Sequence, residues 1–134
     1  MWKISSQPFG FVLTFSGKLD TLSLQAWIDE AKQRLAEPLP ENWGIIVDMR
    51  KLLPLDDDAQ LLMTQGQKEF KSRGMSRVAV VLVDAITILQ FRRLGRSSGV
   101  APLERFINAQ STPNWQAVAK QWVVDGIESP RLST

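Results

Sequence analysis

The chain has 134 residues, of which 44% are hydrophobic and 22% charged, and this fits one globular domain over residues 1–134. Its 16 basic and 14 acidic residues give a formal net charge of +2, too small an excess to predict nucleic-acid binding. The sequence contains no Cys, His or Tyr, which excludes disulfides, thiolate metal sites, and histidine as a general base or metal ligand. We therefore expect no metal, no cofactor and no enzymatic activity.

Hydrophobic patterning predicts no association with a membrane. The longest uninterrupted apolar run, Val78 to Val83, is too short to cross a bilayer. The N-terminal segment MWKISSQPFG lacks the basic-then-apolar pattern of a signal peptide. We expect a cytoplasmic protein.

The N-terminal part of the chain predicts a β-hairpin followed by a helix. Residues 2–5 form a candidate first strand, and residues 9–15 alternate between two faces in the manner of a half-buried strand. Residues 20–21 are candidate N-caps of a helix that ends before Pro38 and Pro40. One apolar stripe runs along this helix, consisting of Leu24, Trp27, Ile28, Ala31 and Leu35.

The segment over residues 43–62, WGIIVDMRKLLPLDDDAQLL, organises the rest of the chain. Its apolar run at 44–47 ends on Asp48, as a buried strand does at its carboxyl end. A loop with Pro54 follows, and then a helix over 57–73, which begins with acids and ends with basic residues. The buried stripe of this helix consists of Ala59, Leu62, Met63, Gly66 and Phe70.

Residues 77–84, RVAVVLVD, are the clearest strand in the chain. They are apolar on both faces, so we expect this strand to be central and covered on both sides. A helix over 86–96, a strand over 104–109 and a helix from about Pro113, closed by Gly126 and Pro130, follow.

The order of elements is therefore β-β-α-β-α-β-α-β-α, which predicts an α/β fold. We expect a mostly parallel sheet of four or five strands with an N-terminal antiparallel hairpin strand, right-handed crossovers and four helices. Should all helices lie on one face, the other side of the strands at 9–15 and 77–84 would need a cover, and this predicts a homodimer.

This order and length resemble the STAS domain, and most closely a group of uncharacterised bacterial SpoIIAA-like proteins. STAS domains commonly carry an apolar strand ending in Asp-Leu, a short loop, and Asp-Ser-Ser-Gly-Leu at a helix start. Asp48-Met49 matches the first pair, Asp56 matches the Asp of the second motif, Asp57 and Asp58 stand where the serines would be, and Ala59 replaces the Gly.

The resemblance implies a regulatory module that binds a protein partner at the turn. In partner-switching STAS proteins one of those serines is phosphorylated to control partner binding. This chain carries carboxylates there, which raises the hypothesis that they imitate the phosphorylated state. The predicted partner-binding residues are Leu55, Asp56, Asp57 and Asp58.

The three adjacent aspartates have two other interpretations. Carboxylate oxygens are ligands that Mg²⁺ prefers, but adjacent acids are poorly spaced to surround an ion. The simpler interpretation is that they cap the helix and complement its dipole. We favour the simpler interpretation over a metal site.

Arg92, Arg93 and Arg96, with Arg105 as a further member, form a candidate basic patch for an anion or an acidic partner. The simplest interpretation is a solvated helix face. The GRSSG segment at 95–99 resembles a phosphate loop but has neither the spacing nor the lysine of one.

Two alternative functions stay open beside a protein-binding module. Met63, Met75 and Phe91 are candidates to line a pocket for a small apolar ligand, because the CRAL-TRIO lipid-carrier fold resembles a larger form of this architecture; this predicts a closed pocket of several hundred Å³. An enzyme based on carboxylates predicts that Asp48 and Asp84 converge on one cleft.

Overall fold

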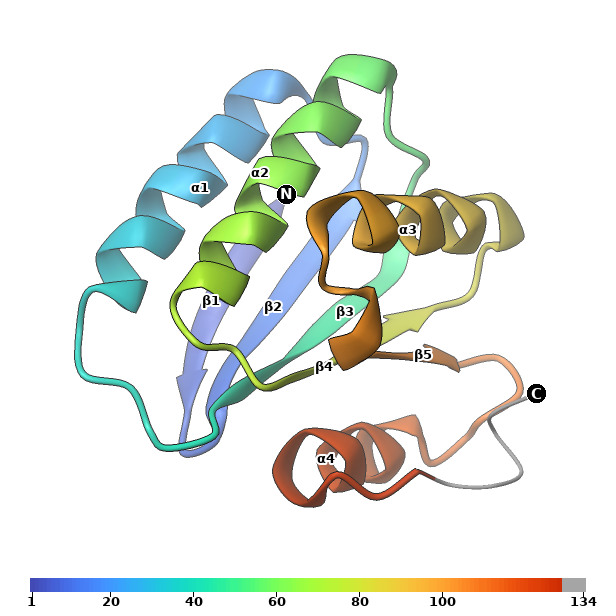
Figure 1. The fold of residues 1–134 in the computed structure, drawn as a ribbon. Coiled ribbons are helices and arrows are strands. Elements are labelled where there is room, and N and C mark those ends of the chain that lie inside the picture. Colours follow the sequence, from blue (N-terminus) through green and yellow to red (C-terminus); the bar gives the residue numbers. More distant parts are fainter. Residues whose placement is uncertain (129–134) are drawn as a thin grey trace.

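The computed structural model describes residues 1–128, in which a five-stranded sheet lies between two layers of helices (Figure 1). Pro130, one of the predicted helix-closing residues, lies outside the described part. The elements, in chain order, are β1 (Trp2–Gln7), β2 (Gly10–Gly17), α1 (Thr21–Leu35), β3 (Gly44–Leu52), α2 (Asp57–Ser72), β4 (Arg77–Leu82), α3 (Ala85–Ser98), the 3-10 helix η1 (Ala101–Leu103), β5 (Glu104–Asn108) and α4 (Trp115–Asp125).

The strands follow one another in the sheet in the order in which they follow in the chain. β1 pairs with β2 antiparallel, and every later neighbour pair is parallel. This confirms the predicted α/β fold with an N-terminal hairpin and four helices. The strand predicted to end at Asp48 instead continues to Leu52, because the pairing of β2 with β3 shifts register between Thr14 and Ser16 and then resumes. Asp48 therefore lies within a strand.

Helices α1, α2 and α3 cover one face of the sheet (Figure 1). The predicted apolar stripe of α1 is buried, and so are four of the five predicted residues of the α2 stripe, Leu62 being partly buried. Trp27 of α1 stacks on Phe70 of α2, with the ring centroids 5.9 Å apart. Gly66 lies directly against the Trp27 indole, where a β-carbon would overlap the ring. The absence of a side chain at Gly66 is therefore what lets α2 approach α1 so closely.

Helix α4 lies alone on the opposite face (Figure 1). Its buried residues Val118, Ala119 and Val123 pack on apolar side chains of β3, β4 and β5 in a second, smaller core. Val78 to Leu82 of β4 are all buried, so this strand is central and covered on both sides, as predicted. The helices do not all lie on one face, and β4 therefore offers no open surface to a second copy of the chain.

Candidate functional site

The turn between β3 and α2 is held in place by its backbone. Leu55 receives a hydrogen bond at its carbonyl from the Gln60 side chain (2.9 Å) and another from Gln90 Nε2 (3.1 Å). Its N–H donates to Gln90 Oε1 (2.8 Å). The turn is also tied to the end of β2, because Leu53 N–H donates to Gly17 O (3.1 Å). Side chains of α2 and α3 thus fix the turn from two directions.

Leu55 does not present its side chain to solvent. It is 3% exposed and belongs to the core beneath α1, α2 and α3. A leucine between Pro54 and an acid has no sequence signal for its direction, and here it points inward and anchors the turn. Leu55 is one of the four predicted partner-binding residues, but its buried side chain is not available to a partner. Its contribution is to fix the backbone of the turn.

Asp56, Asp57 and Asp58 are all exposed at the start of α2. Asp56 is the N-cap residue but makes no side-chain capping bond; its carboxylate pairs instead with Lys18 at 2.9 Å. Asp57 and Asp58 occupy the first turn, where the helix dipole favours negative charge. Within residues 1–128 no three acids are grouped so that they could hold a metal ion, which leaves the magnesium interpretation without support.

Exposed apolar side chains lie in this turn and on the two helices that hold it, α2 and α3. Leu53 lies within it, Leu61 one helical turn further along α2, and Ile86 and Leu89 at the start of α3, and each is more than half exposed. Leu53 and Leu61 are not among the partner-binding residues predicted from the sequence. The signal for Leu61 was present, because it falls outside the apolar stripe that continues through Leu62.

The three predicted arginines of α3 are exposed but make different contacts. The Arg92 guanidinium stacks over the Phe106 ring at 4.8 Å. Arg93 donates a hydrogen bond to Gln60, the same side chain that holds the Leu55 carbonyl. The basic face of α3 therefore adjoins the acidic turn through Gln60. Arg105, the predicted fourth member, is instead buried, because it pairs with Ala79 in the sheet and so faces the α4 side.

The two carboxylates considered for catalysis do not meet. Burial raises the pKa of Asp48, but hydrogen bonds from Arg50 outweigh this effect and hold the pKa below its ordinary value. Asp84 caps α3, and the hydrogen bond from the Thr87 N–H (2.8 Å) lowers its pKa. Asp48 lines a groove beside α4, whereas Asp84 lies at the start of α3, in the helix layer on the other face of the sheet. Both therefore stay ionised in structural roles.

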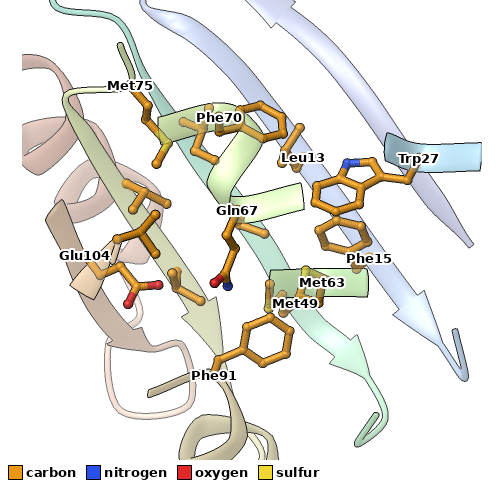
Figure 2. Close-up of a pocket in the computed structure, with 15 residues that line it drawn as sticks. Leu13, Phe15, Trp27, Met49, Met63, Gln67, Phe70, Met75, Phe91 and Glu104 are labelled. Carbon is orange, nitrogen blue, oxygen red and sulfur yellow. The ribbon is translucent and has the colours of Figure 1, made fainter. Parts of the chain in front are cut away.

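The predicted apolar pocket is a small cavity between the sheet and the helix layer (Figure 2). Its volume is about 30 Å³, the space of about one water molecule, and so the several hundred Å³ expected of a lipid carrier are not present. Met63, Met75 and Phe91 do line it. Figure 2 shows the polar ends of Gln67 and Glu104 among these apolar side chains. Burial of Glu104 raises its pKa to about 7, against the attraction of Arg92.

No protein-family model and no curated protein sequence matches the chain. Among solved structures, the chain is similar to the anti-sigma factor antagonist SpoIIAA in its unphosphorylated form. The likeness has a TM-score of 0.58 at 13% sequence identity and covers 87% of this chain and 96% of that chain. The chain has the SpoIIAA-like, or STAS, fold. None of the helices in the described part of this SpoIIAA-like chain is long and apolar enough to span a membrane.

Proposed function

We propose that this SpoIIAA-like chain is a non-enzymatic regulatory module of the cytoplasm that binds a protein partner at the turn between β3 and α2. The recognition surface consists of Leu53, Asp56, Asp57, Asp58 and Leu61, with Arg92, Arg93 and Arg96 at its border. The proposal rests on one observation. Gln60 and Gln90 fix the backbone of the turn, while the carboxylates at 56–58 and the side chains of Leu53 and Leu61 stay exposed.

Such an arrangement favours binding for two physical reasons. A backbone that is already fixed loses little conformational entropy when a partner docks. Covering the exposed leucines makes the free energy of binding more favourable. The neighbouring carboxylates select a partner with basic residues at the matching positions. The similarity to an anti-sigma factor antagonist supports a protein as the partner.

A photo-crosslinking residue placed at Asp58 or at Leu61 tests this function in the cell. We expect both positions to give a covalent adduct with the same protein. The matched control is Lys32, an exposed residue in the second half of α1. Adducts that are absent, or that are the same from Lys32 as from Asp58, would contradict the proposal.

The carboxylate at Asp58 also carries the hypothesis of a permanent imitation of phosphoserine. Asp58→Ser and Asp58→Ala remove the charge while leaving the position exposed. If the charge imitates a phosphate, both variants should change the yield of the crosslink from Leu61 in the same direction. An unchanged yield in both variants would end the hypothesis without touching the proposed binding.

Self-association is the second candidate, carried by the same exposed leucines. A homodimer through this surface predicts that the Leu61 crosslink joins two copies of the chain. Sedimentation of the purified protein then shows a concentration-dependent dimer that Leu61→Asp abolishes. A monomer at all concentrations leaves the heterologous partner as the occupant.

A further inference from the structure

The second helix layer covers only part of its face of the sheet. α4 packs on β3, β4 and β5, and the same face of β1 and β2 has no helix over it (Figure 1). A groove runs between α4 and this open end, and we call it the α4 groove. Two adjoining hollows of about 440 and 480 Å³ form it, and both include Gln7, Phe9 and Lys120.

The first of these hollows has an apolar floor and an aromatic wall. Phe9, Val12 and Ile46 form the floor, and Trp115 closes the end where α4 begins. Val12 and Phe9 are only partly buried, so the floor is accessible. A volume of about 440 Å³ falls within the range typical of small-molecule sites.

The Trp115 wall is braced by a charged pair. The Arg50 guanidinium lies over the Trp115 ring at 4.4 Å. Two hydrogen bonds of 2.9 Å join Arg50 to the two carboxylate oxygens of Asp48, so that these two charges cancel within the hollow. The pair fixes the ring and adds no net charge.

Lys120 then decides the charge of this half of the groove. It lies on α4 one turn after Gln116, is exposed, and makes no ion pair within residues 1–128. The opposing acid, Glu41, lines only the second hollow, at the far end of the groove. The Trp115 half therefore combines an apolar floor with one unneutralised cation and the side-chain amides of Gln7 and Gln116.

We propose that the Trp115 half of the α4 groove binds a small organic anion that carries a flat apolar ring. The ring lies on the floor formed by Phe9, Val12 and Ile46, and the anionic group is directed toward Lys120. An apolar pocket with a few polar groups at one end is the usual form of a small-molecule site. This site is separate from the turn between β3 and α2, which lies on the other side of the sheet and does not line the groove.

An NMR titration with 1-naphthalenesulfonate as the probe tests the proposal, and 1-naphthalenemethanol serves as the uncharged analogue. We expect shifts at the Trp115 indole N–H and at the backbone amides of Gln7, 9–12 and 116–120. Lys120→Met should weaken binding of the sulfonate about fivefold, the effect of about 1 kcal/mol from one exposed charge contact. Lys120→Arg should restore most of the affinity, and the alcohol should respond to neither variant.

Lys32→Met is the matched control, since it removes an exposed lysine from α1 on the opposite face. Equal affinity of Lys120→Met and Lys32→Met for the sulfonate would overturn the proposal. Shifts confined to residues outside the groove would also overturn it. A second copy of the chain in the groove would instead shift the same amides with protein concentration and no probe, and that result too would contradict the proposal.

Discussion

Glu104 makes the stability of this protein depend on pH in a direction opposite to that of an ordinary paired carboxylate. Its side chain lies against Gly95 of α3, where a β-carbon would overlap the carboxylate, and its Oε1 is buried without a hydrogen-bond partner within residues 1–128. Burial therefore disfavours the ionised form and raises the pKa from 4.5 to about 7, while Arg92 opposes the shift.

The sign of the pH dependence follows from this shift. Below about pH 4.5 Glu104 is protonated in the folded and unfolded states alike, and its burial as a neutral acid carries no charge penalty. As the pH rises toward 7, the unfolded chain releases the proton first, so the free energy of unfolding falls. The full penalty, present above about pH 7, is on the order of 3 kcal/mol, from about 1.4 kcal/mol per pKa unit.

The perturbation that isolates this effect is Glu104→Gln, which keeps the shape and removes the titration. Urea unfolding followed by tryptophan fluorescence should give wild type and variant similar stabilities at pH 4.5. At pH 8 the variant should be more stable, by up to about 3 kcal/mol. Glu37→Gln, at an exposed site, is the control for general effects of the charge change. A stability difference between Glu104→Gln and wild type that does not change between pH 4.5 and 8 would refute the reasoning.

Two further variants test the packing and the turn. Gly66→Ala places a β-carbon in the Trp27 ring and should lower the free energy of unfolding by about 1–3 kcal/mol in a urea titration. The control Gln65→Ala, at an exposed position, should stay within about 0.5 kcal/mol of wild type. Equal effects of the two variants would contradict the close approach of α2 to α1. Asp56→Asn breaks the ion pair with Lys18, and both side chains of this pair are exposed. Thermal unfolding should therefore show a loss of stability of less than about 1 kcal/mol. A larger loss would mean that the main role of the acidic turn is to stabilise the fold.

Periodicity predicts the strands β1 to β5 and the helices α1 to α4, but not the short 3-10 helix η1. The alternation over 9–15 and the helical stripes record which face of each segment is buried, and burial is the dominant favourable term in folding. The two-sided apolar character of 77–84 also predicts that β4 is central and covered on both sides, as the two cores show.

The directions of single side chains in irregular segments were not predictable in this way. Leu55 lies in a loop, where no period assigns it to a face, and its burial depends on Gln60 and Gln90 from two helices. The apolar run at 44–47 predicts a strand that ends at Asp48, but β3 continues to Leu52. This extension depends on a register shift in the pairing of β3 with β2, which the sequence of β3 alone does not reveal. Arg105 is predicted as a further member of the α3 arginine patch, yet its place in the alternation of β5 directs it to the other face of the sheet.

The α4 groove had no signal in the sequence. Its residues come from the hairpin, from β3 and from α4, and the outermost, Gln7 and Lys120, are 113 positions apart in the chain. These residues come together only because of the length of α4 and the part of the sheet that it covers. A site of this kind can be identified only from the three-dimensional arrangement of the sheet and its helices.

The most direct measurement of the central claim is the affinity of the crosslinked partner for the purified chain and for a variant with Asp57→Asn and Asp58→Asn. Titration calorimetry should give an affinity for the double variant that is lower by about tenfold or more, because the carboxylates face the partner. The free energy of unfolding should fall by no more than about 2 kcal/mol, from the loss of two charges that complement the dipole of α2. Equal affinities for the two proteins would contradict recognition at the turn between β3 and α2.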